Sequence, residues 1–272
     1  MAQTRTKVAL ALAGGATALL VARAVMGASR AGPSTYPPLD TLKPLASDLW
    51  IVDSGPVRPG GVELPVRMTV VRLRSGGLWL HSPTRLSETL VTELGTLGAV
   101  EHLVAPNVAH WTFLTDWQQR FPGATTWAAP GLRDRAQVRA SGLRLDHDLG
   151  EEPPAPWREQ MDQGLLLGAG GFAEVYFFHR PSGTLMLTDV VQNLEPLRLP
   201  PLTRVFAYLS GSDAETTPRY LRGILKLKRE QSEPAIQRML ALSPRRVTFA
   251  HGTWFERDAS NRLKQALGWL TR

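Results

Sequence analysis

The 272-residue sequence contains no cysteine. Disulfide bonds, thiolate metal ligands and a cysteine nucleophile are therefore excluded. Two further motifs are missing. Ser82 has no Gly-x-Ser-x-Gly context, which argues against a serine hydrolase. The glycine-rich residues 168–171 are not followed by Lys-Ser or Lys-Thr and precede a predicted strand, so they do not match a phosphate-binding loop.

Acidic residues are scarce at both ends of the chain, which carries a formal charge of +7. Residues 1–31 hold four basic and no acidic residues, and residues 219–272 hold 12 basic and 4 acidic residues. Residues 32–218 carry 15 basic and 20 acidic residues. Because the basic character is confined to the ends, we expect no nucleic acid partner. The basic C-terminal fifth would suit anionic lipid headgroups or an acidic protein, and a solvated helical face is the alternative.

Residues 8–27 form an apolar run whose only charge is Arg23. A helix of that length spans roughly 30 Å, the thickness of a bilayer's hydrocarbon core. We therefore expect an uncleaved membrane anchor over residues 1–30, with a cleaved signal peptide as the alternative. We expect a single-pass protein of a bacterial inner membrane. The positive charges that flank the run slightly favour an orientation with the domain on the periplasmic side.

The rest of the chain divides into a linker and one domain. Residues 31–47 contain four prolines and predict an extended linker, and residues 48–272 predict the domain. Strands are expected at residues 48–53, 66–73, 77–81, 100–105, 124–129, 163–167, 174–179, 184–190 and 246–250. Helices are expected at residues 84–97, 131–138, 203–209, 218–227, 232–242 and 259–270. An aromatic-rich helix is also expected after the polar turn that follows residue 106, within the stretch 100–117. Two halves, each with strands followed by helices, predict an α/β fold with two central sheets and helices outside.

Several motifs carry a family resemblance over roughly residues 45–255. They are LWIVD at 49–53, RMTVVRL at 67–73, LWLHSP at 78–83, HLVAPN at 102–107, EVYFFHRPS at 174–182, LMLTD at 185–189 and TFAHG at 248–252. In order and spacing the chain resembles the metallo-β-lactamase superfamily, and most closely a bacterial domain family of unknown function with a degenerate metal site. The resemblance implies an αββα four-layer sandwich.

Catalytic members of that superfamily hold metal with a His-x-His-x-Asp-His turn, a further histidine, an aspartate at a strand end and a last histidine before glycine. The resemblance assigns Asp189 to the aspartate and His251 to the last histidine. The turn at residues 106–111 instead reads PNVAHW, with His110 alone and out of register. The histidine expected near residues 170–172 is missing, and Glu174 is the nearest replacement. A binuclear site is therefore not expected.

A reduced site of His110, Asp189 and His251, with Asn107 or Glu174 as further candidates, could hold one Zn or Fe ion. The alternative is a hydrogen-bonded polar cluster without metal. His102 and His147 are expected at the surface or a strand edge, and His179 is expected to pair with a backbone group.

Two functions follow from these alternatives, and whether the chain is an enzyme stays open. The one favoured is a non-catalytic, membrane-anchored module acting as an accessory or structural subunit of a membrane complex, with no cofactor. The other is a degenerate mononuclear metallo-hydrolase acting on an ester, lactone or thioester. Integral-membrane proteins and lipid are the expected partners. The basic residues expected to contact them are Arg219, Arg222, Lys226, Lys228 and Arg229.

Overall fold

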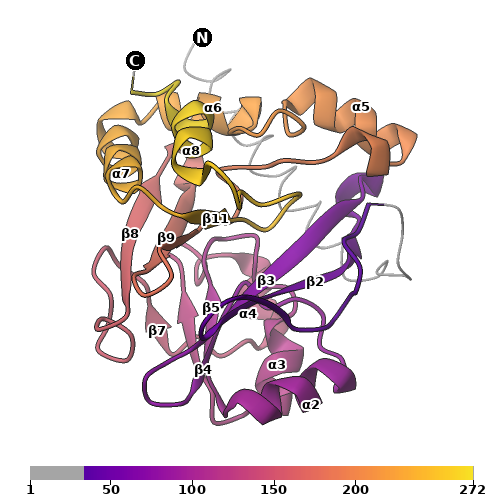
Figure 1. Ribbon diagram of the computed structural model, residues 1–272, viewed down its shortest axis with the longest axis vertical. Coiled ribbons are helices and arrows are strands. Elements are labelled where there is room, and N and C mark those ends of the chain that lie inside the picture. The colour runs from indigo at the N-terminus through magenta and orange to yellow at the C-terminus, as the bar shows by residue number, and fades with distance from the viewer. Residues whose placement is uncertain (1–33, 272) are drawn as a thin grey trace.

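The computed structural model describes residues 34–271 (Figure 1). The predicted anchor, residues 1–30 with the apolar run 8–27, lies outside the described residues. Within residues 34–271, no helix combines the length and apolarity needed to cross a bilayer. The segment expected as a linker, residues 31–47, contributes a strand, β1 (Lys43–Ala46), to the first sheet.

The first sheet has seven strands in the order of the chain. After β1 they are β2 (Leu49–Val57), β3 (Leu64–Arg72), β4 (Leu78–His81), β5 (Val100–Ala105), β6 (Thr125–Ala128) and β7 (His147–Asp148). Strands β1 to β4 pair antiparallel, and β4 to β7 pair parallel. The switch at β4 matters for function, because the carboxyl ends of β4, β5 and β6 then share one edge of the sheet.

The second sheet has four strands in the order β11-β10-β9-β8. Their bounds are β8 (Met161–Leu167), β9 (Ala173–His179), β10 (Thr184–Met186) and β11 (Arg246–Thr248). Strands β8, β9 and β10 form an antiparallel meander, and residues 180–183 connect β9 to β10. Strands β10 and β11 are parallel, so the segments that follow them leave the sheet at the same edge.

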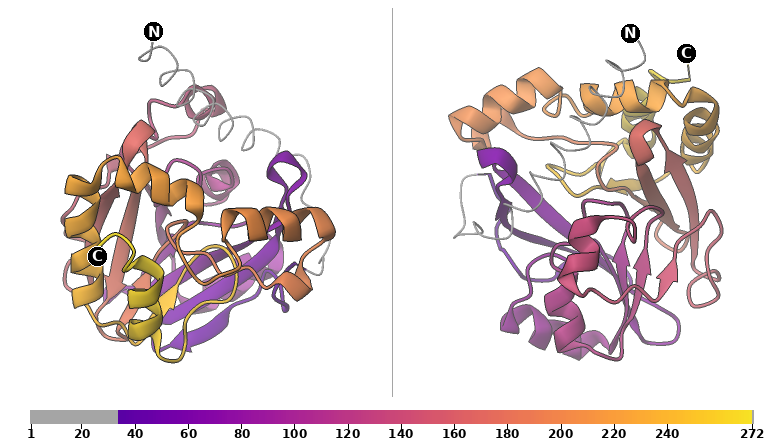
Figure 2. Two further views of the ribbon diagram at one scale, coloured as in Figure 1. Left: turned by 90° about the horizontal axis from the view of Figure 1, so that it is seen from above. Right: turned by 180° about the vertical axis from the view of Figure 1, so that it is seen from behind.

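Helices lie on the outer side of each sheet (Figures 1 and 2). In the first half they are α2 (Glu88–Leu97), α3 (Leu114–Arg120) and α4 (Ala136–Ser141), with the short turn η1 (Pro59–Gly61). In the second half they are α5 (Pro201–Ser210), α6 (Arg219–Lys226), α7 (Arg229–Ala241) and α8 (Ala259–Leu267), with η2 (Ala169–Gly171) and η3 (Pro196–Arg198).

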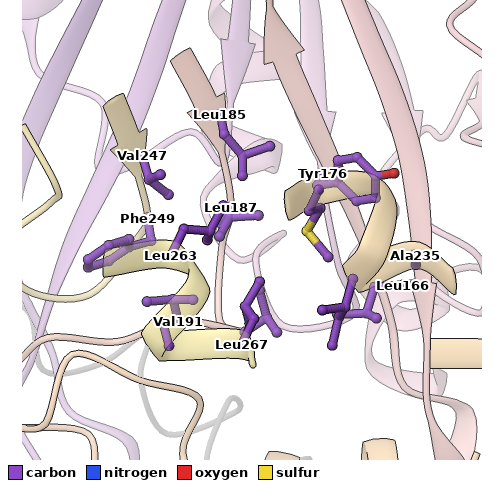
Figure 3. Packing of buried hydrophobic residues seen from close by; sticks show 14 of the residues in the cluster. Leu166, Tyr176, Leu185, Leu187, Val191, Ala235, Val247, Phe249, Leu263 and Leu267 are labelled. Carbon is purple, nitrogen blue, oxygen red and sulfur yellow. The ribbon is translucent and has the colours of Figure 1, made fainter. Parts of the chain in front are cut away.

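Three large apolar clusters hold the two sheets and the helices on them together, and a small fourth cluster packs Ala207 of α5. The alternation of side chains along each strand divides the large clusters. On β9, Val175 and Phe177 face the first sheet and pack with Trp79 and Trp157, while Tyr176 faces outward. The outward side of the second sheet packs on α7 and α8, with Leu185, Val247, Leu263 and Leu267 among the contacting side chains (Figure 3). The outer side of the first sheet packs on α2, α3 and α4. Because side chains alternate between the two sides of a strand, packing on both sides buries nearly every position, as on β9.

The start of α2 departs from the expected helix over residues 84–97. Helix α2 begins at Glu88, because the Ser87 side chain accepts a hydrogen bond from the Leu90 N–H and caps the helix there. Thr84 is buried, and its carbonyl accepts a hydrogen bond from Trp117 Nε1 instead.

Strand β10 is also shorter than expected, ending at Met186 instead of residue 190. The N–H groups of Thr188, Asp189 and Val190 donate to the carboxylate of Glu174 and not to a neighbouring strand. The Glu174 side chain therefore takes the place of strand-to-strand hydrogen bonds for the N–H groups that follow Leu187.

Candidate metal centre

Three side chains predicted as metal ligands meet around one carboxylate oxygen. Asp189 Oδ1 lies 3.0 Å from His251 Nε2 and 3.3 Å from His110 Nε2. The three ligand atoms lie within 4.8 Å of one another, and this is the one such group found in residues 34–271. Neighbouring ligand atoms in a tetrahedral zinc site stand roughly 3.3 Å apart. The spacing of the donors therefore suits a single metal ion.

Sheet topology explains why residues so distant in sequence meet here. Asp189 follows β10 and His251 follows β11, so two parallel strands deliver both side chains to one edge. His110 follows β5 of the other sheet. The two sheets are joined at this point, where Val175 N–H donates to the Pro106 carbonyl over 2.8 Å. The cluster thus lies at the carboxyl ends of strands from both halves of the fold.

The ring of His251 is oriented by the backbone. Its Nδ1 lies 2.7 Å from the carbonyl oxygen of Pro65, at the start of β3. Because a carbonyl only accepts, Nδ1 must carry the hydrogen and donate it. In the neutral ring Nε2 then has a free lone pair pointing at the centre of the cluster. This is how metal-binding histidines are commonly oriented.

Ser82 orients His110 in the same way. The Ser82 hydroxyl lies 2.7 Å from His110 Nδ1, which leaves Nε2 facing Asp189. Ser82 directly follows β4, which is parallel to β5, and it has a φ of 54°. The left-handed backbone is uncommon for serine and turns the chain at the strand end. The sequence analysis did not identify this role, although the parallel pairing of two strands places their following residues together.

Asn107 and Glu174 lie beside the cluster and hydrogen-bond to the residues around it instead of facing its centre. Asn107 Nδ2 donates to Asp189 Oδ2 over 2.7 Å, and its Oδ1 accepts the N–H groups of Ala109 and His110. Glu174 is almost completely buried and uses both carboxylate oxygens on the three backbone N–H groups that follow β10. Both side chains are thus bound to the loops that carry the donors, which leaves His110, Asp189 and His251 as the candidate ligands.

The electrostatics of the cluster couple its members. Burial would raise the pKa of Asp189, but the charge and hydrogen bond of His110, and those of His251, hold it well below its usual range. Burial opposes a charge on His251, yet the hydrogen bond and charge of Asp189 raise its pKa. Burial and the neighbouring Asp189 raise the pKa of Glu174 to about 8. The ionised carboxylate of Asp189 and the protonated ring of His251 thus favour each other.

The other histidines are separate from the centre. His81 is buried against Trp79 and Phe177, and burial lowers its pKa to about 3. His102, expected at the surface or an edge, is buried and accepts from Trp127 Nε1, because β5 lies inside the sheet. His179 pairs with the Ser182 hydroxyl and not with a backbone group. His147 is exposed as expected.

The predicted basic contact residues lie on and after α6, where most of them already have partners in the chain. Arg219 donates to the carbonyls of Tyr208 and Leu209 at the end of α5. Arg222 donates to Thr217 and lies over the ring of Trp269, as does Lys226. Arg229 pairs with Glu233 on α7, and Lys228 is exposed between the two helices. That these residues contact a membrane or a protein partner stays a prediction.

Comparison with known proteins places this geometry in a family. The family described as Domain of unknown function (DUF4336) matches residues 49–221. No curated protein matches the sequence.

Solved structures that resemble the chain include a metallo-beta-lactamase from Pontibacter korlensis, with 15% identity and a TM-score of 0.53 over 84% of this chain and 98% of that one. A diflavin flavoprotein fragment from Nostoc sp. PCC 7120 has 9% identity and a TM-score of 0.59 over 85% and 96%. The metal-soaked flavodiiron core of Flv1 from Synechocystis sp. PCC6803 has 10% identity and a TM-score of 0.59 over 85% and 60%. The expected resemblance is thereby confirmed: the chain has a mixed α/β metallo-β-lactamase-like fold with two sheets.

Proposed function

The chain belongs to the DUF4336 family, and from the donor set on its metallo-β-lactamase-like fold we propose that it binds one metal ion, Zn or Fe, through His110, Asp189 and His251. One observation carries the proposal. Each histidine has its Nδ1 held by a protein oxygen while its Nε2 faces the same oxygen of Asp189. Two imidazoles and a carboxylate are sufficient ligands in kind for either metal.

The residues present define what such a centre would do. When bound, the metal would lower the pKa of a water molecule and polarise a carbonyl group. Asp189 supplies one negative charge, and the Asn107 amide fixes its other oxygen, so the carboxylate offers a single donor atom. Asp189 and His110 keep 17% and 11% of their side-chain surface exposed, so the centre can be reached from solvent. Three protein donors leave a coordination position open, which is the arrangement of catalytic zinc sites. This supports the metallo-hydrolase candidate, with an ester, lactone or thioester as substrate.

Metal analysis tests the site. Protein purified without chelator should hold about one equivalent of Zn or Fe, and His251→Ala or Asp189→Asn should lose it. The matched control is His147→Ala, which removes an exposed histidine and should retain the metal. A content below about a tenth of an equivalent, with no stability change on adding Zn²⁺ or Fe²⁺, would overturn the proposal.

A non-catalytic accessory subunit is the second candidate, and a specific observation favours it. The side chains next to the donors are already hydrogen-bonded within the protein. Asn107 donates to Asp189, and Glu174 accepts from backbone N–H groups. A second metal would find no further ligands from them. Hydrolysis of ester, lactone and thioester substrates by the metal-loaded protein separates the candidates. Turnover that disappears in Asp189→Asn supports the hydrolase. Inactivity together with a large assembly on native electrophoresis of mild detergent extracts supports the subunit.

The membrane anchor is a separate part of the proposal. The apolar run at residues 8–27 has the length of a membrane-spanning helix and supports single-pass insertion in a bacterial inner membrane, with the domain on the periplasmic side. Carbonate extraction of membranes from cells that express the full chain tests insertion, and protease protection tests the side. Release of the intact chain by carbonate would contradict the anchor.

A further inference from the structure

Exposed apolar side chains gather in one short part of the fold. Among residues 34–271, every large hydrophobic residue that is strongly exposed lies between residues 197 and 227. They are Leu197, which is 95% exposed, and Leu202, Val205, Tyr208, Leu209, Tyr220 and Leu227. We call this set the α5–α6 apolar surface. It is carried by η3, α5, α6 and the residue after α6, and both helices lie at one end of the molecule (Figures 1 and 2).

Helix α5 has the reverse of the usual surface pattern. Its buried positions are the small residues Thr203, Ala207 and Ser210, which face the domain. Leu202, Val205 and Leu209, spaced by three and four residues, face solvent together with Tyr208. A surface helix normally buries its apolar stripe and exposes its polar one. An outward apolar stripe of this size marks a contact with something outside the domain.

The charge around this surface is positive. Residues 197–229 contain seven basic and two acidic residues. Of the two acids, Glu215 is paired with Arg262 from α8. Arg204, on α5 itself, and Lys228 are exposed beside the apolar residues. Apolar side chains bordered by Lys and Arg are typical of surfaces that lie in the interface of an anionic bilayer.

The chain also enters the domain beside this surface. Ser34, the first described residue, donates to the Glu63 carboxylate, and the Glu63 N–H donates to Thr203 Oγ1 on α5 over 2.8 Å. Tyr36 lies under Arg198 of η3 at 5.3 Å. Six residues lie between the end of the apolar run at residue 27 and Ser34, and the seven Cα–Cα steps across them reach at most about 25 Å when extended. An anchor at residues 8–27 would therefore hold α5 close to the headgroups.

We propose that the α5–α6 apolar surface docks on an anionic lipid bilayer, so that the domain lies on the membrane and is not merely tethered to it. Leu202, Val205 and Leu209 enter the interface, and Arg204 and Lys228 contact the headgroups. The distance argument rests on the proposed anchor, whereas the apolar pattern and the charge do not.

The absence of cysteine allows a direct test. The full chain with Val205→Cys, labelled with a fluorophore and reconstituted in vesicles, is compared with labelled Thr92→Cys on the exposed side of α2, at the other end of the molecule. With roughly 30% anionic lipid and a quencher on the acyl chains, the label at 205 should be quenched about twofold or more and the label at 92 should not. Replacing the anionic lipid by neutral lipid should weaken the quenching at 205.

A second variant secures the interpretation. Leu202→Gln with Leu209→Gln, both at exposed positions, should lower the quenching at 205 without changing the fold. Equal quenching at 205 and 92 would overturn the docking. A label at 205 that is shielded in detergent and insensitive to lipid quencher would also overturn it, since another part of the chain or a second copy then covers the surface. Whether the protein stays on the vesicles after a carbonate wash tests the anchor separately. If the label at 205 is quenched before the wash but the wash removes the protein, only the anchor is rejected.

Discussion

At the scale of single residues, the centre depends on groups that hold its histidines as much as on the histidines themselves. Ser82 and the Pro65 carbonyl fix the two rings, and Asn107 fixes the carboxylate. The candidate donors Asp189 and His251 could be predicted from the sequence because the family resemblance assigns an aspartate at a strand end and a histidine before glycine to metal binding. Ser82 could not, because its role depends on a hydrogen bond across two strands and on a left-handed backbone that no local pattern indicates.

Ser82→Ala tests this support. The change removes the hydrogen bond to His110 Nδ1 and leaves the ring free to rotate, so we expect the affinity for Zn²⁺ to fall about 10- to 100-fold. Isothermal titration measures the affinity. Ser182→Ala removes an equivalent serine–histidine hydrogen bond at His179, away from the centre, and should leave the affinity unchanged. Equal losses in the two variants would contradict a specific role for Ser82.

A buried histidine should make the fold sensitive to acid. Burial, with the charge of His110, lowers the pKa of His81 to about 3, against an unfolded value near 6.5. Below pH 6.5 the unfolded chain therefore binds a proton that the folded chain does not, and stability falls as the pH falls towards 3. The side chain at position 81 packs against Trp79 and Phe177. Between pH 7 and pH 5 the free energy of unfolding of His81→Phe should fall by about 2 kcal/mol less than that of the wild type. Urea unfolding at both pH values checks this, with the exposed His147→Phe as the unresponsive control.

At the scale of elements, the type and order of strands and helices could be predicted, and their ends could not always be. Apolar periodicity identifies β5 and α2 because β5 is buried on both sides and α2 buries an apolar side. It fails for β7, which has two residues and hence no period, and for the end of β10. There the decisive contact comes from Glu174, a residue 14 positions from Thr188, through its side chain. Contacts at that range leave no periodic signal.

Two glycines of α2 should respond in opposite directions to alanine. Gly95 lies inside the helix with nothing within 4 Å of an added Cβ, so Gly95→Ala should stabilise the protein by up to about 1 kcal/mol. At Gly98, which ends the helix, an added Cβ would lie 2.1 Å from the Gly76 carbonyl oxygen, so Gly98→Ala should destabilise it. Thermal unfolding of both variants gives the comparison. If Gly98→Ala stabilised the protein, the backbone at Gly76 would have to move away from the added Cβ at little cost.

At the scale of the whole molecule, a buried arginine connects the two halves. Arg67 on β3 pairs with Asp53 over 2.7 Å and donates to the carbonyls of Phe249 and Gly252 beside His251. The guanidinium therefore joins the first sheet to the loop that carries a metal donor. The two carbonyl contacts could not be assigned from the sequence, because each spans more than 180 residues.

Removing that side chain should cost far more than removing an exposed arginine. Arg67→Met removes one of the two cations that pair with Asp53, whose Oδ2 keeps Lys43 at 2.8 Å, and it leaves two carbonyls without their donor. We therefore expect the free energy of unfolding to fall by about 3 kcal/mol. Arg72→Met breaks an exposed pair with Asp48 and should cost about 0–1 kcal/mol. Urea denaturation measures both. Similar losses in the two variants would show that Arg67 does not connect the halves energetically.

The centre takes donors from both halves of the sandwich, and this allows the chain to be treated as two complementing fragments. A cut after Glu152, in the exposed segment between β7 and β8, leaves His110 on one fragment and Asp189 with His251 on the other. Neither fragment would hold all three donors. Recovery of a full-affinity metal site on mixing would then report correct reassembly of the two sheets, without any need to know the natural substrate.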